Sequence, residues 1–397
     1  MVLIGGLGGA ALIGFGGHGN GTGGATPRAG GKPSPAQNSH ATSLGALPAD
    51  SGLVMRIVFD PRAPETVYIG TLGTGSTTHG HVYKTTDAGQ HWRSTEHGNS
   101  GWTRVDALAA DPQHPGTLYA GTGVAVYKTV NGGRSWVGWN RGLLPPPPVI
   151  KPGRVSGTPG WRRAEGWVTS LAVDPTNSNV VYAAAGGVRK SLDGGHTWKV
   201  VFWQRNSLLG GVIQLLVTPT SPHMIYAMVA DGSVNNFTSV YESADGGTAW
   251  RQTGLRHVRN RDGWGDSLVF VPKRPTTLYA AIGHSVFRST DAGRSWQSIT
   301  SGLPGQTIAD LAVDPRQPGT VYAAVASKTG AIYKKTNGGR SWRRILSAPF
   351  QVYSLGVDPE RPATVFASGA FVPPHSDQGR YKVLRSIDGG RTWTIAG

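Results

Sequence analysis

The chain has 397 residues, of which 59 are glycine and 27 proline, and its 38 Lys and Arg side chains against 22 Asp and Glu leave a formal net charge of +16. No cysteine is present, which excludes a disulfide framework, a cysteine-ligated zinc and a thiol nucleophile. The glycine content disfavours long helices, the lack of a three-residue glycine period excludes collagen, and 13 Trp and 12 Tyr argue against wholesale disorder.

The first 17 residues form a segment without charged side chains that is rich in Gly, Leu, Ile and Ala. It is short for a membrane span, which needs about 20 apolar residues, and no basic residue precedes the apolar stretch as in a signal peptide. We interpret it as the remnant of a signal peptide or a membrane anchor, and we expect an extracellular or membrane-anchored protein. The alternative is a glycine-rich tail on an intracellular protein. Residues 18–50 have the composition of a low-complexity linker.

Residues 51–397 contain one eight-residue motif seven times. It places Asp or Asn before Gly-Gly or Ala-Gly, and a Trp five residues after the Asp or Asn. The Asp or Asn side chain can accept hydrogen bonds from backbone N–H groups just ahead, and Gly supplies the positive φ of a tight hairpin. Each motif therefore predicts a hairpin whose Trp begins the returning strand. The turn residues are Asp87, Asn131, Asp193, Asp245, Asp291, Asn337 and Asp388, and the tryptophans are Trp92, Trp136, Trp198, Trp250, Trp296, Trp342 and Trp393.

Two further strands precede the strand that enters each motif. The first is an unbroken apolar run that ends in Asp-Pro, as at Asp60. In two repeats Thr218 and Val271 replace the Asp. This pattern predicts a strand that is buried on both faces. The second resembles Val-Tyr-Ala, as around Tyr119. Four strands in a repeat of about 49 residues match one blade of a propeller. We predict an all-β, seven-bladed β-propeller with four antiparallel strands per blade over residues 51–397.

The repeats resemble the Asp-box, or BNR, repeats of sialidases, sortilin-type receptor domains, xyloglucan-degrading glycosidases and photosystem II assembly factors. Leu-Ala-Val-Asp-Pro, Val-Tyr-Ala and the turn motif together are most similar to the xyloglucanase and sortilin branch. The departures are Asn131 and Asn337 in place of Asp, and Lys335 in place of Ser or Thr. The resemblance implies the propeller fold, but the shared motif is structural and does not identify a site. Known xyloglucanases enclose a cleft between two propellers, whereas this chain has one.

Propeller geometry places the motif turns on one face and the connections between blades on the other, where the long insertions predict the working face. Four tryptophans outside the motifs fall near that face and could stack on sugar rings or grip a peptide, or could instead fill gaps between blades. They are Trp102, Trp161, Trp167 and Trp264. The densest basic cluster, a candidate for an anionic ligand or a solvated loop, is Arg256, His257, Arg259 and Arg261.

A glycosidase needs two carboxyl groups about 5–10 Å apart, and the catalytic candidates on the same side are Asp106, Asp266 and Asp310. Asp231, Asp262, Asp377 and Glu165 also fall there. Our first interpretation is a non-catalytic binding propeller for a glycan or protein, with a xyloglucanase-type or sialidase-like hydrolase and an assembly-factor-like scaffold as alternatives. We expect a monomer with a polysaccharide or protein partner, possible membrane anchoring, no nucleic acid, no cofactor and no metal.

Overall fold

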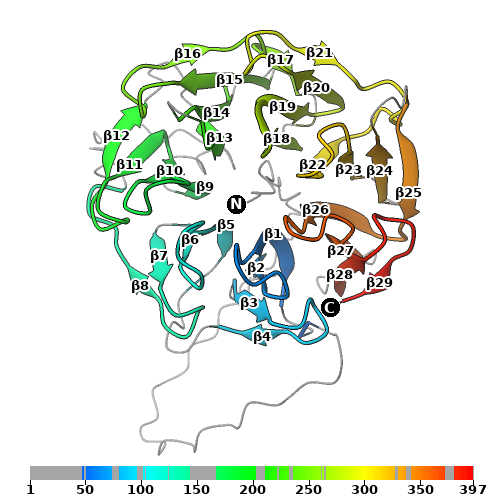
Figure 1. The fold of residues 1–397 in the computed structure, drawn as a ribbon, viewed down its shortest axis with the longest axis horizontal. Helices are drawn as coiled ribbons and strands as arrows, with labels where there is room; N and C mark the ends of the chain where they lie inside the picture. Colours follow the sequence, from blue (N-terminus) through cyan, green and yellow to red (C-terminus); the bar gives the residue numbers. More distant parts are fainter. Residues whose placement is uncertain are drawn as a thin grey trace, which may run out of the picture.

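The computed structural model describes residues 47–48, 51–73, 80–95, 102, 104–123, 125–143, 167–202, 211–220, 223–231, 236–260, 262, 265–326, 330–336, 341–371 and 380–396. These residues form seven antiparallel sheets, each built from strands that are consecutive in the chain. The sheets are arranged in a ring around a central axis (Figure 1). The predicted seven-bladed propeller with four antiparallel strands per blade is therefore confirmed.

The strands of each blade run in chain order from the axis to the rim. The innermost strands are β1 (Leu53–Phe59), β5 (Val105–Ala110), β9 (Val168–Val173), β13 (Gly211–Val217), β18 (Asp266–Val271), β22 (Ile308–Val313) and β26 (Gln351–Val357). The second strands are β2 (Val67–Leu72), β6 (Leu118–Thr122), β10 (Val181–Ala185), β14 (Ile225–Ala230), β19 (Arg274–Ile282), β23 (Val321–Val325) and β27 (Val365–Phe371).

The two outer strands of each blade flank the repeated motif. The third strands are β3 (Val82–Thr85), β7 (Val126–Thr129), β11 (Val188–Ser191), β15 (Phe237–Ser243), β20 (Ser285–Ser289), β24 (Ala331–Lys335) and β28 (Arg380–Ser386). The rim strands are β4 (Arg93–Ser94), β8 (Val137–Gly138), β12 (Lys199–Phe202), β16 (Arg251–Gln252), β21 (Gln297–Ser298), β25 (Arg343–Ser347) and β29 (Thr394–Ile395). Blades 1 to 7 are numbered in this order, and blade 4 has an additional strand, β17 (Val258–Arg259), paired with β15.

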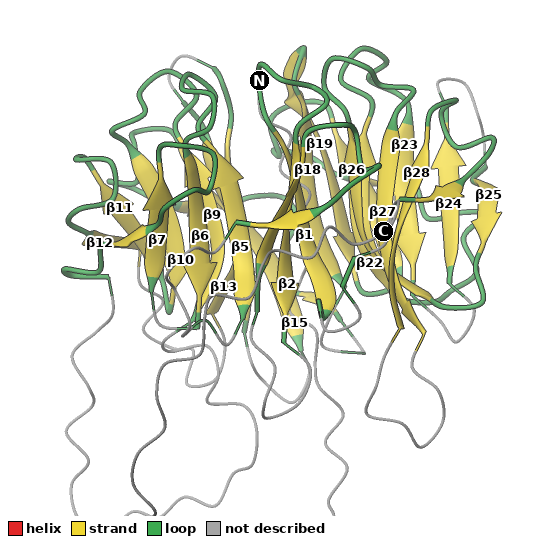
Figure 2. Cartoon of the chain, turned by 90° about the horizontal axis from the view of Figure 1, so that it is seen from below, coloured by secondary structure: helices red, strands yellow, loops and turns green. Residues whose placement is uncertain are grey.

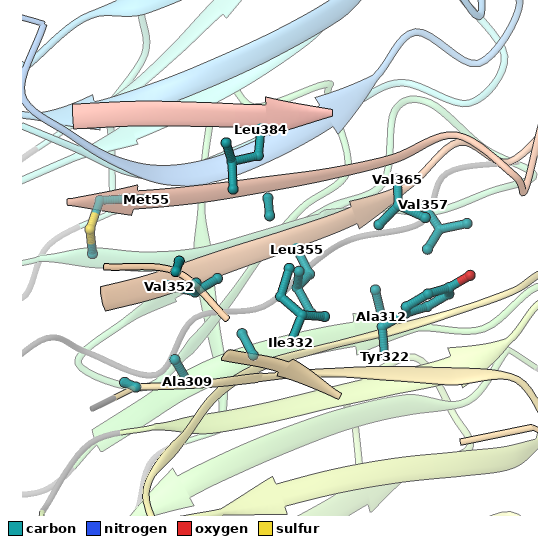
Figure 3. Packing of buried hydrophobic residues seen from close by; sticks show 14 of the residues in the cluster. Met55, Ala309, Ala312, Tyr322, Ile332, Val352, Leu355, Val357, Val365 and Leu384 are labelled. Atoms are coloured by element: carbon teal, nitrogen blue, oxygen red, sulfur yellow. The ribbon is translucent and has the colours of Figure 1, made fainter. Parts of the chain in front are cut away.

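The core lies between blades, because the inner strands are buried on both faces. β5, β18 and β22 have no exposed residue, as the unbroken apolar runs predict. Figure 3 shows one such interface, in which Ile332 and Tyr322 of blade 6 pack against Leu355 and Val357 of blade 7. Met55 of blade 1 joins the same cluster. Each blade is therefore stabilised chiefly by its two neighbours.

The repeated motifs form the turns between the third and fourth strands. In blade 3 the N–H of Gly195 donates to Ser191 Oγ (2.8 Å) and the N–H of Thr197 to Asp193 Oδ1 (2.9 Å). Asn131 accepts the N–H of Ser135 through its amide oxygen at 3.0 Å, so Asn can replace Asp. Hydrogen bonds from Ser295 and Ser289 lower the pKa of Asp291 to about 2. The turn at 337–340 lies outside the described residues.

Four of the motif tryptophans, Trp92, Trp198, Trp250 and Trp342, also donate an indole hydrogen bond to the preceding blade. The indole N–H of Trp250 in blade 4 donates to the carbonyl of Val201 in blade 3 at 3.1 Å. Trp92 of blade 1 reaches Ala396 of blade 7 in the same way. The rings of Phe59 and Phe366 meet edge to face at 5.8 Å at that junction. The ring is thus closed by side-chain contacts between two complete blades.

Candidate functional site

The two faces of the propeller carry different connections. Because the strands alternate in direction, the motif turns and the turns between first and second strands lie on one face. The turns between second and third strands and the blade-to-blade connections lie on the other, which we call the connection face (Figure 2). Trp161, Trp264 and Arg261 belong to connections outside the described residues, as do Glu165 and Asp377.

A belt of polar side chains crosses from blade to blade near the axis. In six blades it is formed by the residue before the shared Leu or Ile of the inner strand, namely Arg56, Ser170, Gln214, Ser267, Asp310 and Ser354, whereas blade 2 has the apolar Ala107 at this position. Gln214 Oε1 accepts the N–H of Leu268 in the next blade at 2.6 Å, and Ser267 Oγ accepts that of Leu311 at 3.2 Å. These bonds satisfy inner-strand N–H groups that the ladder leaves unpaired. The belt therefore has a structural role.

Asp310 is a member of this belt. It is 0% exposed, and Oδ2 accepts the N–H of Leu355 at 2.9 Å while Oδ1 accepts the hydroxyl of Ser267 at 2.9 Å. Burial raises the pKa of Asp310 to about 7, and hydrogen bonds and the charge of Arg56 oppose the rise. A raised pKa suits a general acid, but a carboxyl group without exposure cannot reach a substrate. The structure thus places this catalytic candidate in the frame of the ring.

Asp266, at the start of β18, is only 3% exposed. Its oxygens accept the hydroxyl of Thr238 (2.9 Å) and the side-chain amide of Asn260 (3.1 Å). Burial raises its pKa to about 6, and these hydrogen bonds oppose the rise. Like Asp310, Asp266 is an anchor for other segments and does not face solvent.

Asp106, the third catalytic candidate, lies near the start of β5 and is 6% exposed. Arg104 binds both its oxygens, with Nε 2.5 Å from Oδ2. Burial raises the pKa of Asp106, while Arg104 and the more distant Arg56 oppose the rise. The guanidinium of Arg104 also stacks on the ring of Trp167 at 4.0 Å. Trp167 is half-buried, so the structure brings this candidate aromatic and this candidate acid together around one arginine.

Trp102, which the sequence suggests as a ligand-binding aromatic, belongs to the core. It is 3% exposed and packs against Tyr127 (ring centroids 4.7 Å apart) and Trp136 (5.4 Å). Its large apolar surface fills the space between blades 1 and 2 beneath the connection. It presents no face to a ligand, and the gap-filling alternative describes it.

The basic cluster lies on the segment that forms β17. Arg256, His257 and Arg259 are exposed, and the N–H of His257 donates to Ser239 Oγ at 2.9 Å. β17 pairs with β15, so this part of the connection is held as a fifth strand of blade 4. The cluster is thus fixed at its backbone, while its cationic groups remain in solvent.

A further group of side chains meets where the connections of blades 4, 5 and 6 adjoin. His284 Nε2 lies 2.6 Å from Asp262 Oδ2, and the hydroxyl of Thr307 donates to the same oxygen. Asp262 is among the carboxylates that the sequence places on this side, but sequence reasoning missed His284 and Thr307. No local pattern joins them, because they are 22 and 45 residues from Asp262.

The described part of the chain contains neither a metal-binding cluster nor a membrane-spanning helix. No three His, Asp or Glu side chains there cluster as a metal site would require. The same residues include no helix that is long and apolar enough to cross a membrane.

No protein-family model matches the chain. It is 27% identical over 360 residues to a xyloglucanase of Hypocrea jecorina, which covers 77% of this chain and 40% of that protein. A xyloglucanase of a Paenibacillus species is 25% identical over 351 residues, covering 75% of this chain and 32% of the relative. The chain therefore spans less than half the length of these curated relatives.

The solved structures that resemble this one share its fold. The GH74 enzyme of Niastella koreensis superposes with a TM-score of 0.59 at 18% identity, covering 89% of this chain and 67% of that one. YCF48 of Cyanidioschyzon merolae superposes with a TM-score of 0.55 at 16% identity, covering 87% of this chain and 98% of that one. At these identities the likeness concerns architecture alone.

The comparisons correct our first functional interpretation. The sequence favoured a non-catalytic binding propeller, because the repeated motif is structural and no catalytic pair could be identified. That interpretation is wrong, since the curated relatives are named xyloglucanases and GH74 enzymes are among the structural neighbours. The alternative, a glycoside hydrolase, agrees with them, and the chain is a seven-bladed propeller similar to xyloglucanases.

Proposed function

We propose that this chain is a propeller unit of a glycoside hydrolase that cleaves a polysaccharide of the xyloglucan type. The observation that carries the proposal is the similarity to a xyloglucanase over 360 residues, which covers 77% of the chain. A match of that length runs through many of the seven repeats and is not confined to one structural motif.

The connection face supports this chemistry. Hydrolysis of a glycosidic bond needs carboxyl groups as acid and as base or nucleophile, and the face carries a half-exposed carboxylate at Asp262. It also carries Trp167, whose ring is held by the guanidinium of Arg104 at 4.0 Å. Aromatic rings with polar neighbours are suited to stacking on sugar rings while hydroxyl groups are hydrogen-bonded.

The test uses the full chain with soluble xyloglucan, and an unbranched, water-soluble cellulose derivative serves as the matched control. We expect new reducing ends from xyloglucan and a lower rate with the unbranched polymer. Chain-length analysis of the products would distinguish internal cleavage from release at an end. Failure to release reducing ends from either polymer, by a preparation that shows one cooperative unfolding transition, would overturn the proposal.

A further inference from the structure

The carboxylate of Asp262 lies where three segments of the connection face converge. Asp262 is in the connection from blade 4 to blade 5, His284 is in the turn between β19 and β20, and Thr307 immediately precedes β22. Both partners contact Asp262 Oδ2: His284 Nε2 lies 2.6 Å away, and the hydroxyl of Thr307 donates a hydrogen bond to it. Because the partners come from different segments, the carboxylate plane is fixed from two directions.

The segment that carries Asp262 is anchored in the core. Asn260, 1% exposed, donates its N–H to the carbonyl of Asn236 at 2.7 Å and its side-chain amide to the buried Asp266 at 3.1 Å. The amide oxygen of Asn260 accepts the N–H of Asp262 at 3.3 Å. The buried Asp266 therefore has a structural role, because it binds Asn260, the residue that positions Asp262.

The turn that carries His284 packs closely against Asn260. Gly283 has φ +56°, and a β-carbon there would lie 2.9 Å from Asn260 Oδ1. The carbonyl of Gly283 accepts the N–H of Ile308, next to Thr307, at 2.8 Å. The segments of His284 and Thr307 are thus joined by a backbone hydrogen bond, and Asn260 lies between the His284 turn and Asp262, which is the support that a preorganised site requires.

Accessibility distinguishes Asp262 from the three carboxylates that the sequence suggested. Asp262 is exposed and His284 is half-buried, whereas Asp106, Asp266 and Asp310 are only 6%, 3% and 0% exposed. A catalytic carboxylate must be held in place and must also reach water and substrate. Of these four carboxylates, Asp262 meets both requirements.

We propose that Asp262 is the general base of the hydrolase, with His284 and Thr307 as positioning residues; this inference rests on the proposed function. Asp262 takes a proton from a water molecule, whose oxygen forms a bond to the anomeric carbon as the bond from that carbon to the glycosidic oxygen breaks. The departing oxygen takes a proton from a carboxylic acid on the opposite side of the sugar. The products are two shorter saccharides, and one water molecule is consumed.

The principal test compares Asp262→Asn with the wild-type full chain. We expect kcat on xyloglucan to fall by about 10²- to 10⁴-fold, the usual contribution of general-base catalysis, with KM changed by less than about threefold. Asp231→Asn is the matched control. Asp231 also lies on the connection face, and it accepts the N–H of Phe237 through Oδ1 (3.0 Å), a bond that Asn keeps. Its kcat should stay at the wild-type value.

The test of the positioning residues uses the pH dependence of kcat, which a purely structural role would leave unchanged. Thr307→Val and His284→Asn should lower kcat by about 3- to 30-fold, and His284→Asn should also change the pH dependence of kcat, because it removes a titratable group beside the base. The smaller Asp262→Ala should regain activity with added formate or azide, which can replace the missing base. This rescue keeps the test valid even if Asp262→Asn folds poorly.

The outcomes separate the two proposals. An active wild-type chain whose Asp262→Asn variant keeps kcat within threefold would overturn the role of Asp262 and leave the proposed function standing. An active wild type whose Asp262→Ala variant loses activity without rescue by either anion also contradicts a general base. A wild-type chain that is folded and inactive removes the proposed function, and this inference with it.

Discussion

The ammonium group of Lys128 occupies the space that a β-carbon would need at Gly194. Lys128 is on β7 of blade 2, and its Nζ donates to the carbonyl of Gly194 in the motif turn of blade 3 at 3.3 Å. A β-carbon built at Gly194 would lie 2.9 Å from that nitrogen. Tyr119 completes the joint, since its hydroxyl donates to the same carbonyl at 3.1 Å and Lys128 Nζ lies 5.1 Å from its ring centroid.

The same joint recurs around the ring and explains a variation in the motif. The equivalent lysine and glycine pairs, with 2.7–3.2 Å between Nζ and the built β-carbon, are Lys84 and Gly132, Lys190 and Gly246, and Lys334 and Gly389. Two motifs have Ala at this glycine position, at Ala88 and Ala292. The preceding blades there carry Arg385 and Glu242 in place of lysine. Alanine is thus present where no lysine reaches across.

Gly194→Ala should destabilise the protein by about 1–2 kcal/mol. The residue has φ +66°, where a side chain is strained, and the methyl group would displace the ammonium of Lys128. The measurement is the free energy of unfolding in urea. Ala292→Gly is the control for the backbone term alone, because Ala292 has φ +60° and no lysine reaches it; it should stabilise the protein by no more than about 1 kcal/mol. Equal effects of Gly194→Ala with Lys128 and with Lys128→Met would contradict the steric coupling.

Replacing Glu242 by lysine together with Ala292→Gly should stabilise the joint between blades 4 and 5. Glu242 is 2% exposed; Arg251 binds one carboxylate oxygen, and Oε2 is buried without a hydrogen-bond partner among the described residues. Burial raises the pKa of Glu242, and Arg251 opposes the rise. The double variant rebuilds the joint of the other blades, and we expect a gain of about 1 kcal/mol in urea unfolding.

Glu242→Lys alone is the matched control for the double variant, because the methyl group of Ala292 would meet the new ammonium group. It should be less stable than the double variant. The reverse order of stability would show that the correlation between lysine and glycine does not reflect their packing.

Arg56→Met should destabilise the ring by about 3 kcal/mol at pH 8, because it leaves buried acidic groups without their cation. Arg56 is 4% exposed, donates to the carbonyl of Thr169 at 3.1 Å, and interacts with Asp310 and Asp106. The loss should be smaller at pH 5, where Asp310, with a pKa near 7, is protonated. Urea unfolding at both pH values tests this, with the exposed Arg62→Met as control. A loss independent of pH would contradict the electrostatic explanation.

The free energy of unfolding should fall as the pH rises from about 4 to about 7. Burial raises the pKa of Asp266 to about 6 and of Asp310 to about 7, whereas the unfolded chain ionises near 3.9. In this interval the folded state holds protons that the unfolded state has released, so raising the pH favours unfolding. Urea titrations across the window measure the slope. Asp266→Asn should reduce it, and a slope equal to that of the wild type would contradict the shifted pKa.

The fold could be predicted because its chemistry is local and repeated. The hydrogen bonds of a turn such as that of Asp193 join residues four or fewer positions apart. Each apolar run likewise shows by itself that its strand is buried on both sides. Seven copies of such short-range information indicate both the blade and the number of blades.

The candidate site could be predicted only in part, because exposure depends on residues distant in the chain. The sequence suggested Asp106, Asp266 and Asp310 as catalytic candidates, but all three are buried. Asp310, for example, is bound by the N–H of Leu355, 45 residues away. Conversely, the partners of Asp262 at His284 and Thr307 come from two later connections. The turns could be predicted from the sequence because their hydrogen bonds form within one motif. Which carboxylate remains accessible, here Asp262, depends on the tertiary structure, because closure of the ring brings separate blades into contact.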